Sequence, residues 1–130
     1  MKLSLTLALL AGLAACESDE TISGYADPAI TWGLQQIDGV AFDASATIRF
    51  PEKGRVEGRA PCNSYFANQT VPYPWIAIEA IGSTKMACPD LAAESAFFEA
   101  LGRVTLAEIL SDTLILSDES GFQMLFRAAP

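Results

Sequence analysis

The sequence predicts an α+β fold that is mostly β: a strongly curved antiparallel sheet, or a small barrel, of about six or seven strands with one helix packed against it. Three observations predict this class. Short runs of alternating apolar and polar residues make up much of the chain after residue 30. The connections between these runs are of hairpin length and contain Gly, Asp and Ser. One run has the period of a helix, and no strand–helix–strand alternation indicates a parallel sheet.

The strands are expected where short apolar runs are bounded by turn residues. The clearest run places Ala46, Ile48 and Phe50 on one face, and a turn-forming stretch at 51–54 follows it, so we expect a hairpin with the next run. Residues 66–74 contain two prolines and are expected to be irregular. The runs expected to form strands are 30–34, 46–50, 55–60, 75–81, 105–110, 113–117 and 122–127.

A helix is expected from Pro89 to Gly102. Proline suits the first turn of a helix, an acidic residue beside it interacts favourably with the helix dipole, and glycine suits the end. Positions i, i+3, i+4 and i+7 of one face carry Glu94, Phe97, Phe98 and Leu101. We expect this face to pack against the sheet.

The first residues have the pattern of a secretory signal. Lys2 provides a positive charge, a short apolar run follows, and residues 13–16 read Leu-Ala-Ala-Cys. This ending resembles the lipobox of bacterial lipoproteins, in which the cysteine becomes the lipid-modified first residue. We therefore expect a lipoprotein signal peptide over 1–15, lipidation of Cys16 and an acidic tether over 16–29. The alternative is an ordinary signal peptide, with Cys16 an incidental free thiol.

A lipid anchor would attach the protein to a membrane of the bacterial cell envelope, facing the periplasm.

Composition narrows the classes of partner and of chemistry. The formal net charge of −8 argues against nucleic-acid partners. The sequence contains no histidine, which excludes Ser-His-Asp and Cys-His catalysis and histidine-based zinc sites. We expect no metal, no cofactor, no catalytic residue and hence no enzyme.

Several motifs follow one another in a specific order. They are Trp32-x-Leu34, Gly54-Arg55-Val56-x-Gly58 leading into Cys62-Asn63-x-Tyr65, Thr84-Lys85-Met86-Ala87-Cys88, Glu94-x-x-Phe97-Phe98-x-Ala100-Leu101 and Asp112-Thr113-Leu114-x-Leu116. Together they resemble the META domain family, which includes the HslJ-like heat-shock proteins, and the resemblance assigns residues 30–130 to this domain. It implies a compact, β-rich, barrel-like domain with a helix, of a kind often found in envelope lipoproteins and associated with stress responses. It implies no established reaction.

The chain departs from the family pattern at Pro61, where glycine is common. Proline has no backbone N–H and cannot take a positive φ, so the turn before the first motif cysteine must differ from one built on glycine.

Cys62 and Cys88 form an even pair if Cys16 is acylated. In an oxidising compartment such pairs usually form disulfides, and this bridge would stabilise the fold by about 3–4 kcal/mol in the chain-entropy model. Two separately buried thiols are the alternative. A redox or nucleophilic role would require a neighbour that favours the thiolate, and Lys85 and Arg59 are close in sequence.

Glu94 is expected to be buried with the apolar face of the helix. A carboxylate in that position needs backbone N–H groups or a cation such as Lys85 or Arg103 as its partner. A catalytic acid is the alternative, although the sequence places no second carboxylate to work with it.

A candidate recognition or structural motif around the cysteines consists of Asn63, Tyr65, the segment Thr84-Lys85-Met86 and Glu94. The structural interpretation is favoured. It places Asn63 in a left-handed turn and packs Tyr65 flat, with its hydroxyl in water.

The leading hypothesis for function is a non-enzymatic, membrane-anchored envelope lipoprotein domain, monomeric, that binds or supports another envelope component in a stress response. The alternative is a small barrel carrier for a lipid or other apolar ligand, which a continuous cavity above about 300 Å³ would favour. A third hypothesis is a thiol-dependent enzyme.

Overall fold

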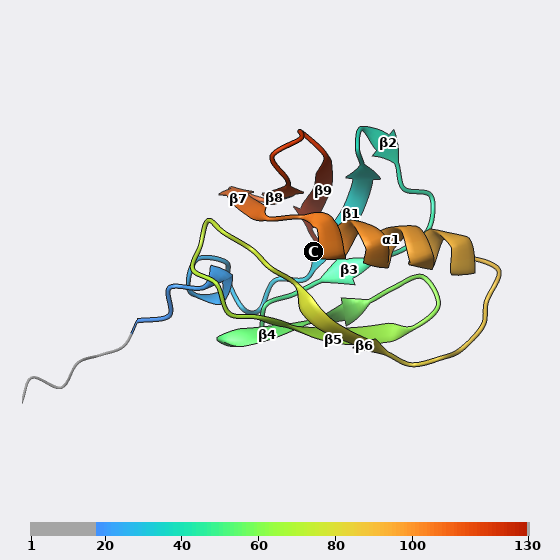
Figure 1. The fold of residues 1–130 in the computed structure, drawn as a ribbon, viewed down its shortest axis with the longest axis horizontal. Helices are drawn as coiled ribbons and strands as arrows, with labels where there is room; N and C mark the ends of the chain where they lie inside the picture. The colour runs from blue at the N-terminus through green and yellow to red at the C-terminus, as the bar shows by residue number, and fades with distance from the viewer. Residues whose placement is uncertain (1–17, 130) are drawn as a thin grey trace, which may run out of the picture.

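The computed structural model of the protein describes residues 18–129. Strands dominate, with one α-helix late in the chain and a short 3₁₀ helix (η1) before the first strand (Figure 1). In chain order the elements are η1 (Ile22–Gly24), β1 (Trp32–Ile37), β2 (Val40–Ala41), β3 (Thr47–Ile48), β4 (Gly54–Arg59), β5 (Ser64–Gln69), β6 (Glu79–Ser83), α1 (Leu91–Arg103), β7 (Leu106–Leu110), β8 (Thr113–Ser117) and β9 (Gln123–Ala128).

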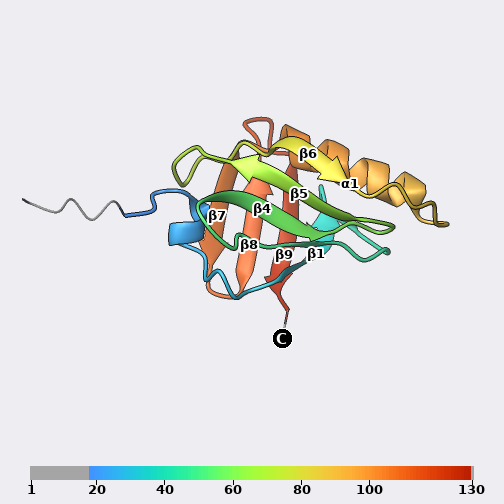
Figure 2. The same ribbon diagram turned by 90° about the horizontal axis from the view of Figure 1, so that it is seen from below.

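The strands form two antiparallel sheets. The larger has the order β2-β1-β9-β8-β7, with β3 also paired to β1, and the smaller has the order β4-β5-β6. The smaller sheet crosses over β7, β8 and β9 as a second layer (Figure 2). Two isolated bridges, Arg49↔Glu57 and Trp75↔Leu106, join residues from different parts of the fold. The predicted β-rich α+β class is confirmed, and no continuous ladder closes the described strands into a barrel.

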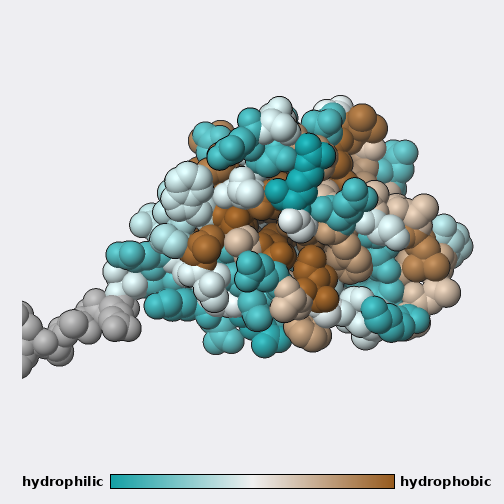
Figure 3. Space-filling view, viewed as in Figure 1, coloured by the Kyte–Doolittle hydropathy of each residue, from teal (hydrophilic) through white to brown (hydrophobic). Residues whose placement is uncertain are grey.

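The core lies between the two sheets and beneath α1. Trp32, Phe50 and Phe126 are among its largest side chains, each at most 1 % exposed. The helix runs along one side of both sheets and buries Phe97 and Leu101 completely, as the helical period predicts (Figures 1 and 2). Full burial of each such side chain stabilises the fold by about 1.5–3 kcal/mol. On the face shown in Figure 3, apolar side chains lie in a band across the middle and hydrophilic ones surround them.

The predicted hairpin between 46–50 and 55–60 is reduced to one bridge, Arg49↔Glu57. β3 pairs with β1, and β4 pairs along its whole length with β5, a strand that the sequence did not indicate. The alternation of β5 is obscured by the polar Gln69, which occupies a buried position. Its side chain is satisfied there, because Nε2 donates to the Val71 carbonyl at 2.6 Å and Oε1 accepts from the Ala77 N–H at 2.8 Å.

The strand expected over 75–81 is also displaced. Trp75 bridges Leu106 of β7, and only from Glu79 does the chain pair with β5 as β6. The chain therefore changes its partner within the expected strand, which explains why the run of apolar residues does not form one continuous element.

The described part of the predicted tether belongs partly to the fold. Ile22 is 1 % exposed, and the neighbouring Thr21, Ser23 and Ala26 are also buried. Burial tends to raise the pKa of Asp19, but hydrogen bonds from Ser23 and Thr21 outweigh it and leave that pKa below its ordinary value. The composition of 16–29 predicts a free linker because it contains few apolar residues, but within the described part Ile22 and Ala26 are buried in the core.

Cys16 and the predicted signal peptide over 1–15 lie outside the described residues. Within residues 18–129, α1 falls short of the length and apolarity that a membrane-spanning helix requires.

Candidate functional site

The turn between β4 and β5 is fastened to the segment before α1 by a cluster that we call the clasp. Its centre is a disulfide between Cys62 and Cys88, whose Cα atoms lie 5.5 Å apart. The predicted disulfide is therefore confirmed in preference to two separate thiols. The clasp consists of Cys62, Asn63, Thr84, Met86, Cys88 and Glu94.

Asn63 is the most fully bonded side chain of the clasp and is 3 % exposed. Its Nδ2 donates to the Met86 carbonyl at 3.0 Å and to Glu94 Oε2 at 2.8 Å. Its Oδ1 accepts from the Thr84 hydroxyl at 2.8 Å and from the Met86 N–H at 2.7 Å. An asparagine side chain has two donors and two acceptor positions, so its capacity is saturated. The expected left-handed turn is wrong, because Asn63 has no positive φ. Its side chain instead forms hydrogen bonds with the segment before α1 and with α1 itself.

Glu94 is 6 % exposed on the inner face of α1, as the helical spacing predicts. Its Oε1 accepts the Cys62 N–H at 3.1 Å, and its Oε2 accepts from Asn63. Two kinds of partner were predicted for Glu94, backbone N–H groups or a cation, and the structure shows a backbone N–H group, that of Cys62. Lys85 is exposed, and Arg103 pairs with Asp118. Glu94 therefore ties the helix to the β4–β5 turn.

Pro61 is accommodated because the turn does not need its missing N–H. The Ala60 N–H donates to the Asn63 carbonyl at 2.7 Å and closes the turn around Pro61 and Cys62. Proline is well suited to an inner position of such a turn.

The prediction that the Tyr65 hydroxyl lies in water is wrong. Tyr65 is 3 % exposed, and its hydroxyl donates to the Thr47 carbonyl at 2.6 Å; burial raises its pKa above the ordinary value. The contact requires glycine at 58, since a Cβ there would lie 2.2 Å from the Thr47 oxygen. Tyr65 therefore joins β5 to β3 beneath the surface, with Phe97 of α1 against its ring at 5.5 Å between centroids.

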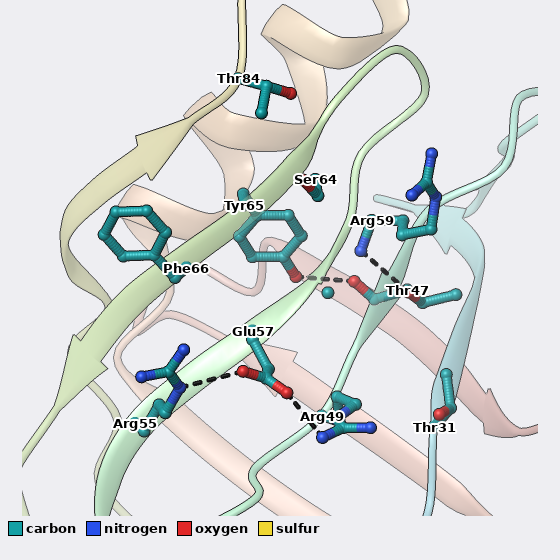
Figure 4. A pocket seen from close by; sticks show the side chains of 11 residues that line it. Thr31, Thr47, Arg49, Arg55, Glu57, Arg59, Ser64, Tyr65, Phe66 and Thr84 are labelled. Carbon is teal, nitrogen blue, oxygen red and sulfur yellow. Dashed lines mark hydrogen bonds and ion pairs between the residues drawn. The ribbon is translucent and has the colours of Figure 1, made fainter.

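Above this contact lies a groove of about 570 Å³ (Figure 4). It follows the seam where β3 and β4 are joined by one bridge, and it extends over the outer face of β4 and β5. We call it the arginine groove. Its lining consists of Thr31, Thr47, Arg49, Arg55, Glu57, Gly58, Arg59, Ser64, Tyr65, Phe66 and Thr84.

Three arginines and one carboxylate give the arginine groove a positive charge within an acidic chain. Glu57 pairs with two of the arginines: Oε1 lies 2.6 Å from Arg49 Nη2, and Oε2 lies 2.9 Å from Arg55 Nε. The Arg59 side chain makes no ion pair within residues 18–129, while its backbone N–H donates to the Thr47 hydroxyl at 3.0 Å. Figure 4 shows its guanidinium directed away from the Arg49–Glu57–Arg55 group.

The residues expected to form a motif are divided between these two places. Asn63, Met86 and Glu94 lie in the clasp and Tyr65 in the floor of the arginine groove, while Thr84 contributes to both. Lys85, also exposed, lines a smaller pocket of about 270 Å³ beside the clasp, with Met86, Leu91 and Phe98 among its walls.

Sequence reasoning did not single out Arg49, Arg55 and Phe66 as site residues. Outward-facing arginines on a strand look like an ordinary solvated face, and only the juxtaposition of β3, β4 and β5 reveals the groove. The sole sequence signal is that three arginines occur within residues 49–59 of an acidic chain.

The site contains no cluster with the composition of a metal centre: within residues 18–129, no three His, Cys, Asp or Glu side chains meet in a way that could hold a metal ion.

Fold and site together define a β-rich domain of two crossed sheets and one helix, fastened by a disulfide-centred clasp. A sequence profile of the META domain matches residues 28–130, and the chain belongs to that family.

Solved structures share the fold at low identity. An NMR structure of a protein from Burkholderia xenovorans is 22 % identical, with a TM-score of 0.60 over 77 % of this chain and 81 % of that one. A second NMR structure is 16 % identical at the same TM-score, covering 77 % and 89 %. A crystal structure of a DUF4847 family protein from Bacteroides vulgatus is 19 % identical, with a TM-score of 0.51 over 63 % and 57 %. No curated protein matches the chain.

Proposed function

We propose that the chain is a lipid-anchored lipoprotein of the bacterial cell envelope, whose META domain faces the periplasm and binds another envelope component without catalysing a reaction. The Cys62–Cys88 disulfide is the observation that carries the proposal, since structural disulfides form and persist in oxidising compartments such as the periplasm. The Leu-Ala-Ala-Cys sequence at 13–16 supports the anchor.

The use of the polar groups in the clasp supports binding over catalysis. The side chains of Asn63 and Glu94, which look chemically capable in the sequence, are taken up by hydrogen bonds to Cys62, Thr84 and Met86. The two motif thiols are joined to each other. These groups stabilise the fold, and the exposed arginines of the groove are the side chains open to a partner.

A carrier for an apolar ligand receives less support. The space between the sheets is occupied by bulky side chains such as Trp32, Phe50 and Phe97. The arginine groove, at about 570 Å³, exceeds the size that would favour a carrier, but it lies outside the core, and charged side chains make up four of its eleven lining residues. A part in a stress response is supported by the family resemblance alone.

The anchor is tested by Cys16→Ser. We expect the chain that keeps Cys16 to incorporate labelled palmitate and to sediment with membranes. The Cys16→Ser variant should lose both properties because its acceptor thiol is gone. Retention of the Cys62–Cys88 disulfide, measured by mass spectrometry without reductant, is the control that the variant is exported and folded. A variant that still incorporates palmitate contradicts the proposal.

The binding function is tested by chemical crosslinking of the full chain in intact cells, followed by mass spectrometry. We expect crosslinks to one or a few envelope proteins. Recovery of a copurifying lipid without any protein partner would replace the proposal by the carrier alternative.

A further inference from the structure

We propose that the arginine groove binds an acidic polypeptide segment of a partner protein, with carboxylates on Arg59 and Arg55 and an apolar side chain on Phe66. The inference rests on the proposed function and gives the chemistry of the envelope component that the domain binds.

Charge is the first reason for an acidic partner. The protein carries a formal net charge of −8, yet the groove brings together Arg49, Arg55 and Arg59 against Glu57 alone. Glu57 occupies one donor each of Arg49 and Arg55 and leaves further N–H groups on both. Since Arg59 has no ion-pair partner within residues 18–129, its planar guanidinium is open to a bidentate carboxylate.

Exposure favours a polypeptide over a small anion. The Arg49 and Arg55 side chains are 43 % and 52 % exposed, and Phe66 is 56 % exposed. Small-molecule sites bury about 70–90 % of their ligand, which an open groove of this kind does not provide. Arginine and aromatic side chains at an open surface are instead typical of the residues that contribute most to protein interfaces.

The free edge of β4 has few backbone N–H groups left to pair with an added strand. Its N–H groups that point away from β5 are already used: Arg55 donates to the Glu52 carbonyl, Glu57 to the Arg49 carbonyl, and Arg59 to the Thr47 hydroxyl. A partner must therefore be recognised by side chains, and in this groove the polar side chains that remain available are mainly cationic (Figure 4).

The groove is also preorganised, which reduces the ordering cost of binding. Its floor is fixed by the buried Tyr65–Thr47 hydrogen bond, and Glu57 orients two of the three guanidinium groups. Thr84, at the edge towards the clasp, is held by its bond to Asn63.

The test uses the full chain in a zwitterionic detergent and two fluorescein-labelled synthetic dodecapeptides. One alternates Glu with Phe and Ser, and the other has Lys in place of every Glu. Binding is measured by fluorescence anisotropy at low and physiological ionic strength. We expect the acidic peptide to bind at least tenfold more tightly than the basic one, and to weaken as salt screens the charges.

Matched variants locate the site. Arg59→Gln and Arg103→Gln each remove one positive charge, but only Arg59 lines the groove, whereas Arg103 lies on Phe122 at 4.0 Å. We expect Arg59→Gln and Phe66→Ala each to weaken binding of the acidic peptide at least fivefold, and Arg103→Gln to change it less than twofold. Equal binding of the two peptides, or equal losses from the two Arg→Gln variants, would overturn the proposal.

Two further measurements distinguish the proposed polypeptide site from a phosphate site, and failure of this proposal from failure of the proposed function. Inorganic phosphate is added as a competitor; displacement of the acidic peptide at low millimolar phosphate would indicate a phosphate site and overturn the polypeptide proposal. Membrane attachment is measured independently through Cys16. A chain that is anchored but shows no preference for the acidic peptide contradicts only the groove, and one that binds the peptide but is not anchored contradicts only the proposed function.

Discussion

The clasp and the arginine groove share the β4–β5 hairpin and use it in opposite ways. In the clasp, Asn63 and Glu94 are buried, and each bonds to protein groups far away in sequence. In the groove, Arg55, Arg59 and Phe66 are exposed on the outer face of β4 and β5. The β4–β5 hairpin therefore contributes its turn to stability and the outward positions of its strands to a surface.

This difference explains why a dense polar motif is a poor guide to a binding site in this protein. A polar side chain that is fully satisfied inside the fold contributes to structure, because a ligand would have to displace existing hydrogen bonds. The groove arginines have donors left over at the surface. The following predictions test how separate the two regions are.

The largest effect is expected from Asn63→Ala. It leaves the Thr84 hydroxyl, the Met86 N–H and carbonyl and the Glu94 carboxylate short of a partner, and we expect a loss of about 4 kcal/mol in the free energy of unfolding. Urea denaturation measures it. Asn68→Ala, on the exposed face of β5, is the matched control and should cost less than about 0.5 kcal/mol. Similar losses from both variants would show that the clasp contributes little.

Removing the disulfide should affect stability and leave recognition intact. With Cys62→Ala and Cys88→Ala together, we expect a loss of about 3–4 kcal/mol in the free energy of unfolding. Under conditions where the variant remains folded, its affinity for the acidic peptide should change less than twofold. A folded variant that no longer binds the peptide would show that the clasp and the groove act as one unit.

Gly58→Ala should affect both stability and the groove. The added Cβ would lie 2.2 Å from the Thr47 oxygen and 2.9 Å from the Tyr65 hydroxyl, so β3 and β4 must separate. We expect a loss of about 1–3 kcal/mol and weaker binding of the acidic peptide. Gly102→Ala is the control, since nothing lies within 4 Å of its added Cβ. An unchanged affinity in folded Gly58→Ala protein would exclude a role for the groove floor.

The smallest effect is expected from an exposed ion pair that belongs to neither region. A hydrogen bond from the Ser120 side chain lowers the pKa of Asp118 most, and a hydrogen bond from Arg103 lowers it further, so that this pKa is about 2. Because this value is below that of an unfolded aspartate, about 3.9, the stabilisation is present above that pH and is lost as the pH falls towards 2. Urea denaturation between pH 2 and 6 should show that the free energy of unfolding falls less on acidification in Asp118→Asn than in the chain with Asp118. Parallel profiles would contradict the assignment.

The elements that the sequence predicts well are those whose pattern is local. The inward face of Ala46, Ile48 and Phe50 and the buried face of α1 follow from alternation and helical period, and both are observed. β5 was missed because it begins at a motif that looks like a turn and buries Gln69, whose acceptable burial depends on Ala77 and Val71.

The site was partly predictable for the same reason. The cysteine pair and the burial of Glu94 follow from counting and spacing. The four bonds of Asn63 depend on Thr84 and Met86, which reach it only through the fold. The arginine groove arises where β3 and β4 meet at one bridge, and no local pattern specifies that junction.

If Cys16 carries the proposed lipid, the docking of Ile22 limits how far the domain can move from that anchor. With Cys16 lipidated, the chain from Cys16 to Ile22 spans at most about 20 Å even when fully extended. Because Ile22 is 1 % exposed within the core, the remainder of the acidic segment cannot lengthen this reach without local unfolding. The domain would thus remain close to the bilayer that carries it, and a partner should be sought among proteins attached to the same membrane or able to approach it.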